Sequence, residues 1–360
     1  MAPAKRMLYT NERMTDAPST GTPGQAAAAA NDSAPDPGRA ARRRVDPFDL
    51  IERYGILIVW IAVIVLFSIL RPSTFPTTIN FETIFSTQAV LLVMTLGLIV
   101  ALTAGEFDLS IGATMGFGAV LVAWLNVNHH WSIGWAIAAT LVFGICFGLF
   151  NAFLIVKIGV PSLVATLGTG TLLGGIGFGI TNSVTIGGIS SKLVNTTGKQ
   201  IFGLTVAFYV GLAGVVILWY VLEYTPLGRH LLFVGESREV ARLAGLRVDA
   251  IRAGSLVASA AVATFAGVVQ AGSIGAADPG GGTSYLLPAF AGAFLGQTAI
   301  RPGRFNAWGT FVAVYFLVTG ITGLQLLGYV GWVQDVFYGG SLVVAVALGR
   351  LAARRRTVEA

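Results

Sequence analysis

The chain has 360 residues, of which 54% are hydrophobic and only 11% are charged, and its mean hydropathy is +0.75. A soluble domain carries about 25% charged residues to cover its surface, so this composition excludes an ordinary soluble protein and predicts a membrane protein. The single cysteine, Cys146, excludes an intrachain disulfide. Three scattered histidines offer no convincing metal or acid–base centre, and we expect no metal, no cofactor and no catalytic residues.

The first 47 residues differ in composition from the rest of the chain. They are rich in Ala, Pro, Ser, Thr and Gly and end in the run Arg42–Arg44. Because they contain too few large apolar side chains to bury a core, we expect a disordered cytoplasmic tail. No short apolar stretch lies near Met1, so a cleaved signal peptide is not expected. A second, basic tail is predicted over residues 351–360.

Apolar stretches recur between these tails at the length that crosses a bilayer, which is about 20 residues. We therefore predict an all-α fold, a polytopic membrane helical bundle of about ten transmembrane helices over residues 48–350. The third and eighth stretches are the shortest, and a tilted, broken or re-entrant path is open for each. The predicted spans are 53–70, 86–104, 108–125, 133–156, 161–181, 202–222, 252–272, 285–300, 306–323 and 331–349.

Lysine and arginine residues distribute unevenly between the predicted connections. If the N-terminus is inside, 20 of them are cytoplasmic and three, Arg71, Lys192 and Lys199, are outside. Positive residues concentrate on the cytoplasmic side, so we predict that both termini are cytoplasmic. The net charge of +6 then reflects topology and contact with anionic membrane lipids, and nucleic acid is not an expected partner.

Five pairs of glycines have the spacing that lets two helices approach closely. Such pairs mark helix contacts, or they arise by chance in a chain with 46 glycines. The pairs are Gly112 with Gly116, Gly144 with Gly148, Gly170 with Gly174, Gly175 with Gly179, and Gly292 with Gly296.

The longest predicted cytoplasmic connection runs over residues 223–252. Ser237 as N-cap and Gly245 as C-cap predict a short helix over residues 238–244. We expect this helix to place polar and small apolar side chains on opposing sides, Glu239 and Arg242 against Ala241 and Leu243. It is either a solvated helix that only joins two spans or a docking element for a soluble partner.

This connection resembles the coupling loop of ABC importer permeases, where a short helix with Glu-x-Ala-x-x-x-Gly spacing docks on the ATPase subunit. Glu239, Ala241 and Gly245 have that spacing. The resemblance implies that Glu239, Ala241, Arg242, Gly245 and Leu246 couple the chain to a cytoplasmic ABC ATPase.

Further motifs resemble the ribose-type monosaccharide ABC transporter permease family, in the same order and over about residues 50–350. Residues 104–112 (AGEFDLSIG) look like its Gly-Gly-Ile-Asp-Leu-Ser-Val-Gly segment, and residues 160–169 (VPSLVATLGT) look like its Pro-Pro-Phe-Ile-Ala-Thr-Leu-Gly-Thr segment. Residues 295–298, Gly303 and residues 309–310 are similar to its late Leu-Gly-Gly-Thr and Gly-Thr elements. Glu106 and Gln297 stand where that family usually has glycine.

The resemblance implies the membrane-spanning permease subunit of an ATP-driven importer in the bacterial inner membrane. A monosaccharide or similar small polar solute would cross it without chemical change. The implied partners are a second permease copy in a homodimer, ABC ATPase subunits and an extracytoplasmic solute-binding protein, with Lys192 and Asp278 as docking candidates. No G-x-x-x-x-G-K-[ST] motif occurs, so ATP hydrolysis is expected on a separate chain.

Two acidic residues in the 104–112 segment allow more than one interpretation. Asp108 is predicted to cap the following helix, where a carboxylate accepts backbone N–H bonds, and Glu106 is expected in water at the inner interface. Ionisable groups at membrane depth are often functional, so the alternative is an ion-gradient-driven secondary transporter that uses Glu106 and Asp108.

Four side chains are candidates for the translocation pathway: Asp108, Ser110, Thr166 and Thr169. The two threonines are three residues apart, share a helix face and could line a polar path. Hydrogen bonds from their hydroxyls to carbonyls of the preceding turn are the other interpretation.

Overall fold

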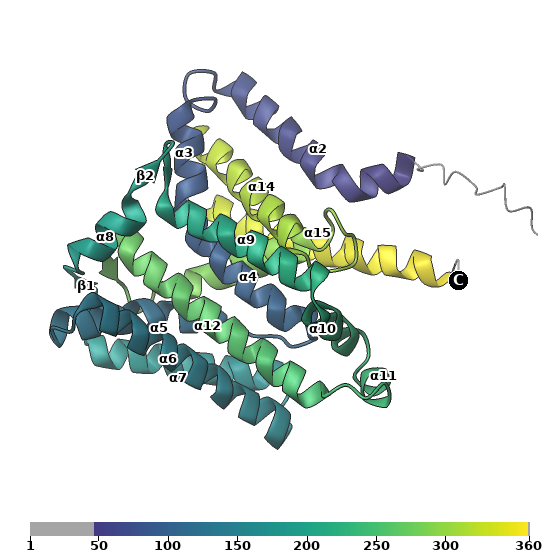
Figure 1. Cartoon of the computed structure of the whole chain (residues 1–360). Helices are drawn as coiled ribbons and strands as arrows, with labels where there is room; N and C mark the ends of the chain where they lie inside the picture. Colours follow the sequence, from purple (N-terminus) through teal and green to yellow (C-terminus); the bar gives the residue numbers. More distant parts are fainter. Residues whose placement is uncertain (1–46, 359–360) are drawn as a thin grey trace, which may run out of the picture. The chain divides into compact units, whose positions relative to one another are not determined.

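The computed structural model describes residues 47–358, so the predicted tail over residues 1–47 lies almost wholly outside the described residues. The described part is mostly helical, as predicted (Figure 1). Its α-helices are α2 (Pro47–Leu70), α3 (Thr78–Thr87), α4 (Ala89–Thr103), α5 (Ile111–Ala123), α6 (Ile133–Ala152), α7 (Ser162–Thr181), α8 (Ser191–Gly198), α9 (Val206–Tyr224), α10 (Pro226–Glu236), α11 (Arg238–Leu243), α12 (Val248–Ile274), α13 (Leu286–Gly296), α14 (Ala307–Leu326) and α15 (Trp332–Val358).

Short elements extend or join these helices. The π-helices η1 (Trp124–Asn128) and η2 (Phe153–Ile158) continue α5 and α6, and the 3₁₀ helix η3 (Thr283–Tyr285) precedes α13. Two-residue strands form two antiparallel pairs, β1 (Ile186–Gly187) with β4 (Ala276–Ala277) and β2 (Gln200–Ile201) with β3 (Leu204–Thr205).

The structure supports part of the predicted set of ten membrane crossings. In the described part six helices are long and apolar enough to cross a membrane, or seven if the bent pair α3–α4 forms one span. The segments 54–70, 283–296 and 332–347 are apolar but shorter, so ten crossings are not confirmed. The break also falls in the second predicted span, where α3 and α4 meet at 40°, whereas the third is one continuous 18-residue helix.

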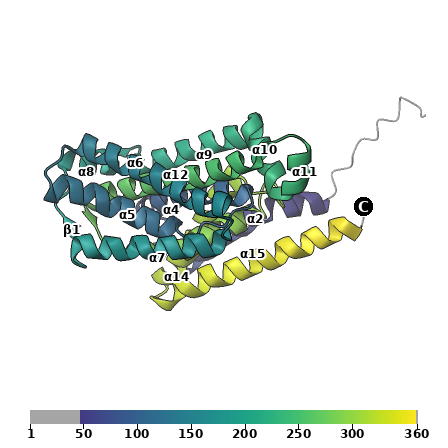
Figure 2. The same ribbon diagram turned by 90° about the horizontal axis from the view of Figure 1, so that it is seen from below.

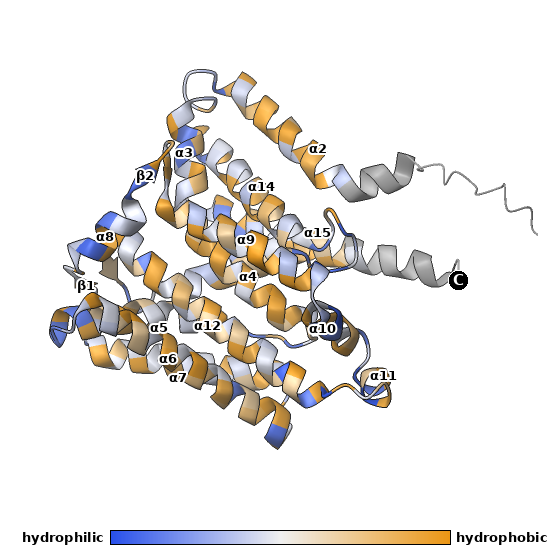
Figure 3. Ribbon diagram, viewed as in Figure 1, coloured by the Kyte–Doolittle hydropathy of each residue, from blue (hydrophilic) through white to orange (hydrophobic). Residues whose placement is uncertain are grey.

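Helix α4 lies at the centre of this arrangement. Every residue of α4 except Val100 is buried, and a helix that is apolar all round belongs in an interior. The long helix α12 packs along α4, α5 and α6. By contrast, only about a third of the residues of α6 and α7 are buried, and their outer faces are hydrophobic (Figure 3). These faces suit contact with lipid.

The glycine pairs divide into those that make helix contacts and those that do not. Gly112 and Gly116 both approach the backbone of Gly282, and Gly144 and Gly148 both approach α12. The pair on α13, Gly292 and Gly296, approaches α14. Only Gly170 of its pair has a close neighbour, and both members of the pair Gly175 and Gly179 face open space. The spacing therefore marks an interface in some pairs and arises by chance in others.

Connecting elements collect at opposite ends of the helices. The β1–β4 pair and α8 lie at one end, while α10, α11, the start of α2 and the end of α15 lie at the other (Figure 1). The predicted basic tail from residue 351 continues α15 as helix as far as Val358. The assignment of the α10–α11 end to the cytoplasm remains a prediction from the charge distribution.

Candidate functional site

The connection between α9 and α12 contains two helices rather than the one predicted. Thr225 caps α10 by accepting a hydrogen bond from the Gly228 N–H (3.4 Å), with Pro226 in the first turn. Ser237 caps α11 by accepting from the Val240 N–H (3.4 Å), which confirms the predicted cap. The loop also ends sooner than predicted, because α12 begins at Val248 rather than near residue 252.

Gly245, the predicted C-cap, lies one residue beyond the actual cap of this short helix. It has φ +81°, a left-handed conformation that glycine adopts without steric cost. Helix α11 itself stops at Leu243 with Ala244 as its C-cap. The cap residues therefore predicted the helix to within one residue.

The prediction that polar and small apolar side chains lie on opposing sides of α11 is partly wrong. Glu239, Arg242 and Gly245 are exposed, and Leu246 is half-buried. Ala241, however, is fully buried against Val234 and Val248, whereas Leu243 is 88% exposed. Residues two apart on an α-helix point about 200° from each other, so Ala241 and Leu243 cannot share one face. Ala241 anchors α11 to its neighbours, and Leu243, with the less exposed Val240, is presented outward.

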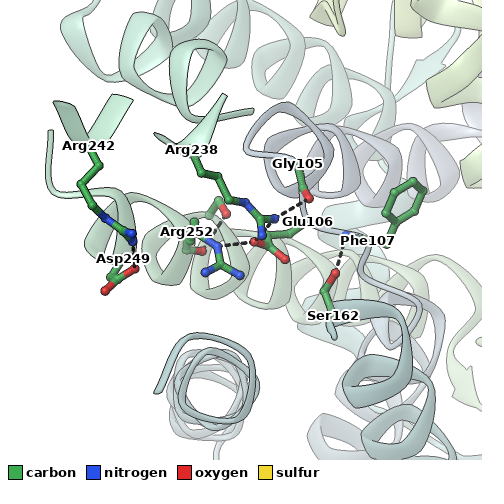
Figure 4. Close-up of polar contacts among 9 residues, drawn as sticks. Gly105, Glu106, Phe107, Ser162, Arg238, Arg242, Asp249 and Arg252 are labelled. Atoms are coloured by element: carbon green, nitrogen blue, oxygen red, sulfur yellow. Dashed lines mark hydrogen bonds and ion pairs between the residues drawn. The ribbon is translucent and has the colours of Figure 1, made fainter. Parts of the chain in front are cut away.

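Glu106 lies in the turn after α4 and is the centre of an ion-pair cluster (Figure 4). Its Oε1 accepts hydrogen bonds from Arg238 Nη2 (2.8 Å) and Arg252 Nε (2.5 Å), and Arg238 also donates to the Gly105 carbonyl (3.1 Å). The glutamate side chain is 1% exposed, so the expectation of a carboxylate in water is wrong. A buried charge is tolerated when opposite charges compensate it, and these two arginines do so.

This cluster joins three parts of the chain. Arg238 is the first residue of α11, Arg252 lies in the second turn of α12, and Glu106 follows α4. The backbone is close at the same place, since a Cβ on Gly235 of α10 would lie 3.3 Å from the Gly105 nitrogen and closer still to the Thr103 carbonyl. The exposed helix α11 is thus tied to the turn after α4 by the Arg238–Glu106 ion pair. Arg252 ties α12 to the same turn, and Gly235 brings the backbone of α10 against it.

Asp108 begins a separate buried network. Its Oδ1 accepts from the N–H (3.0 Å) and hydroxyl (2.5 Å) of Ser110, and its Oδ2 accepts from the Ser259 hydroxyl of α12 (2.7 Å). Ser110, not Asp108, occupies the cap position of α5, so the predicted cap is wrong in position. The carboxylate ties the turn before α5 to α12 instead.

The network continues into α6 and α7. Asn151 donates to the Ser110 hydroxyl (3.1 Å) and accepts from the Thr169 hydroxyl (2.8 Å). Thr166 accepts from the Leu109 N–H (3.0 Å) and also lies 2.7 Å from the Ser162 carbonyl, the back-bond that was the second interpretation. The structure therefore brings all four predicted pathway residues together, each buried within the chain. Their role in a pathway stays a prediction.

Two members of this network were not predicted. Asn151 is a polar residue inside the apolar stretch 133–156, and Ser259 lies inside 252–272. A buried polar side chain needs a hydrogen-bond partner, so the asparagine alone was a sequence signal for a buried contact. Nothing in the sequence identified Ser259, because serine is frequent in membrane helices.

The docking candidates Lys192 and Asp278 are exposed. Lys192 lies on α8, and Asp278 follows β4 and accepts a hydrogen bond from the Gly280 N–H (3.1 Å). Because β4 pairs with β1 and α8 packs on α12, both residues lie at the end opposite α11 (Figure 1). A contact with another protein remains a prediction for both.

Residues 80–346 match the protein family described as "Branched-chain amino acid transport system / permease component". This match covers most of the chain, so the chain belongs to this family of transport permeases. The predicted relation to monosaccharide ABC transporter permeases is confirmed by the similar proteins.

These relatives match most of the chain. The chain is 27% identical over 303 residues to the D-allose transport system permease protein AlsC of Escherichia coli (strain K12), covering 84% of this chain and 93% of that protein. It is 30% identical over 270 residues to the autoinducer 2 import system permease protein LsrC of Escherichia coli (strain SMS-3-5 / SECEC), covering 74% and 78%. LsrC of Photorhabdus laumondii is 27% identical over 270 residues, covering 74% and 80%. No solved structure matches the chain.

Proposed function

We propose that this chain is the membrane-spanning subunit of an ATP-driven importer for a monosaccharide or a similar small polar solute. It would work in a bacterial plasma membrane with about ten membrane crossings and both termini in the cytoplasm. The names of the relatives, which refer to D-allose transport and autoinducer 2 import, support the substrate class. The charge distribution supports the orientation.

The observation that carries this proposal is the link from the exposed helix α11 to buried Glu106. An ATPase subunit that pushes α11 would move Arg238, which contacts both Glu106 and the Gly105 carbonyl. This displacement would reach the turn before α5. In that turn Asp108 is hydrogen-bonded to Ser259 of α12, and Ser110 is hydrogen-bonded to Asn151 of α6. Packed interiors switch between discrete arrangements rather than bending continuously, so a displaced turn would shift several spans together.

The partners follow from the same architecture. The chain lacks a phosphate-binding P-loop motif, so the ATPase would be a separate subunit docked on Glu239, Arg242, Gly245 and Leu246. Two copies of the permease would form the pathway between them. A solute-binding protein would dock at the opposite end, near Lys192 and Asp278.

Reconstitution into vesicles with candidate ATPase subunits and solute-binding proteins tests the proposal. We expect solute uptake that requires ATP and continues after a protonophore removes the proton gradient. Glu239→Ala with Gly245→Leu should abolish the permease-dependent stimulation of ATP hydrolysis, while Thr171→Val, at an exposed position of α7 outside both docking surfaces, leaves it intact. Uptake that needs no ATPase and stops with the protonophore would overturn the proposal in favour of an ion-driven transporter.

A further inference from the structure

A cavity of about 390 Å³ lies between α4, α10 and the first turns of α12. None of the side chains of the Glu106 cluster or the Asp108 network lines it, whereas Gly245 and Leu246 of the proposed ATPase-docking surface lie on its wall. Most of its wall is apolar, with Val100, Leu231, Ile251 and Ala258 as typical members. Its polar side chains are His230, Arg247 and Ser255.

Charge is confined to one end of the cavity. Arg247 precedes the first residue of α12, whereas Ala258 lies three turns further along it, and eleven residues of helix rise roughly 16 Å. Arg247 is exposed, its side chain has no hydrogen-bond or ion-pair partner among the described residues, and none of the described lining residues is acidic. The cavity therefore offers an unneutralised cation at a helix end and an apolar channel beyond it.

The surroundings favour a lipid over a water-soluble ligand. Helix α12 is long and apolar enough to span a membrane, and such a span would put its first residues near the headgroup layer. The apolar rim residue Leu227 is 53% exposed, and a large exposed apolar side chain at the mouth of a cavity suits a hydrocarbon environment. Helices α9, α10 and α12 share one side of the bundle, opposite α7 and α15 (Figure 2).

We propose that this cavity binds one anionic phospholipid. An acyl chain lies along α12 past Gly254 towards Ala258, and the phosphate accepts hydrogen bonds from Arg247 and His230. The inference rests on the proposed orientation, in which this end faces the cytoplasm, the side where basic pockets between membrane helices suit anionic headgroups. The bound lipid joins α10 to α12, the two helices that flank the exposed α11.

Gly254 allows the cavity to be filled without disturbing the protein. A Cβ at this position meets no atom within 4 Å, so Gly254→Leu projects a side chain into the space of the acyl chain. Gly174 of α7 also has no neighbour within 4 Å and does not line the cavity, so Gly174→Leu is the matched control. For the headgroup, Arg247→Gln removes the charge, and Arg229→Gln, an exposed arginine of α10 outside the cavity, is its control.

Native mass spectrometry of the full chain in detergent measures the bound lipid directly. The probes are phosphatidylglycerol, phosphatidylcholine with the same acyl chains, and inorganic phosphate. We expect one tightly bound phosphatidylglycerol, its loss in Gly254→Leu, and a preference over phosphatidylcholine that falls about fivefold in Arg247→Gln, the effect of one arginine at an anionic surface. The two control variants should bind as the unchanged chain does.

Three results would overturn the proposal. Equal binding of phosphatidylglycerol and phosphatidylcholine by the unchanged chain would show that the cavity does not recognise an anionic headgroup. Binding of inorganic phosphate without lipid would show that the ligand is water-soluble. If Gly254→Leu retains the lipid but no longer binds the ATPase subunit, the cavity receives a protein partner. Each variant should have the same melting temperature as its control. A loss of bound lipid then reflects a change at the site rather than unfolding.

Discussion

Glu106 has two positively charged neighbours and one oxygen without a partner. Arg238 and Arg252 both contact Oε1, whereas Oε2 is buried and has no hydrogen-bond partner among the described residues. The two arginines differ in exposure, at 46% and 14%. Water therefore screens the Arg238 contact more than the Arg252 contact, and Arg252 depends more on the carboxylate.

We expect Glu106→Gln to reduce ATP-driven uptake and to destabilise the chain by about 2 kcal/mol, the cost of leaving a buried charged partner unsatisfied. The amide keeps the size of the side chain but leaves Arg252 without a counter-charge. Uptake by reconstituted vesicles and the melting temperature in detergent measure the two effects. Arg304→Gln is the control, because its pair with Glu236 is exposed and 3.8 Å long. If the two variants have the same uptake and the same melting temperature, the buried Glu106 cluster contributes no more than an exposed ion pair.

Asn151 is the residue that connects α6 with the Asp108 network. Asn151→Leu leaves the hydroxyls of Ser110 and Thr169 without this partner, so we expect a loss of about 1–3 kcal/mol and a lower melting temperature. Thr171→Val on α7 is the control, since that exposed hydroxyl bonds only to its own helix at Leu167. An Asn151→Leu variant as stable as the control would show that the buried network contributes little.

At the scale of single elements, α11 combines a buried anchor with an exposed apolar side chain. Leu243 is the most exposed large hydrophobic side chain on α11, at 88%, compared with 52% for Val240. We expect Leu243→Asp to leave folding intact but to weaken binding of the ATPase subunit at least about tenfold, since burying a leucine at an interface is worth about 1.5–3 kcal/mol. Co-purification and stimulated ATP hydrolysis measure this effect. Unchanged binding would remove Leu243 from the docking surface.

Helix pairs differ in how much their glycines matter. A Cβ at Gly148 of α6 would lie 2.7 Å from the Val257 Cα of α12, whereas one at Gly179 of α7 meets nothing. Gly148→Leu should therefore lower stability by about 1–3 kcal/mol through overpacking, and Gly179→Leu should not. Thermal unfolding in detergent compares them. Equal melting temperatures would contradict the close α6–α12 contact.

At the scale of the whole molecule, the orientation in the membrane can be tested chemically. The exposed Cys146 is first replaced by serine, and single cysteines are then placed at Lys192 and Arg242. A membrane-impermeant maleimide should label Lys192→Cys in intact spheroplasts and Arg242→Cys only after lysis. The reverse labelling pattern would show that the topology is opposite to the one predicted from the 20-to-3 distribution of Lys and Arg.

The sequence by itself determined the features that depend on neighbouring residues. Low charge and long apolar stretches predicted a helical membrane protein, and Ser237 and Gly245 predicted the limits of α11. Such features follow from composition, helix length and capping within a few residues. The bend between α3 and α4 and the second helix of the α9–α12 connection were not predicted.

Only the tertiary structure decided the partners of the buried polar groups. Glu106 meets Arg238 and Arg252, which lie 132 and 146 residues further along the chain, and Asp108 meets Ser259 across 151 residues. The sequence locates an acidic residue at the end of a span, but it does not identify the arginines that pair with it in the folded chain. A carboxylate is stable in water or beside an arginine, and the packing of α11 and α12 against the end of α4 selects the second.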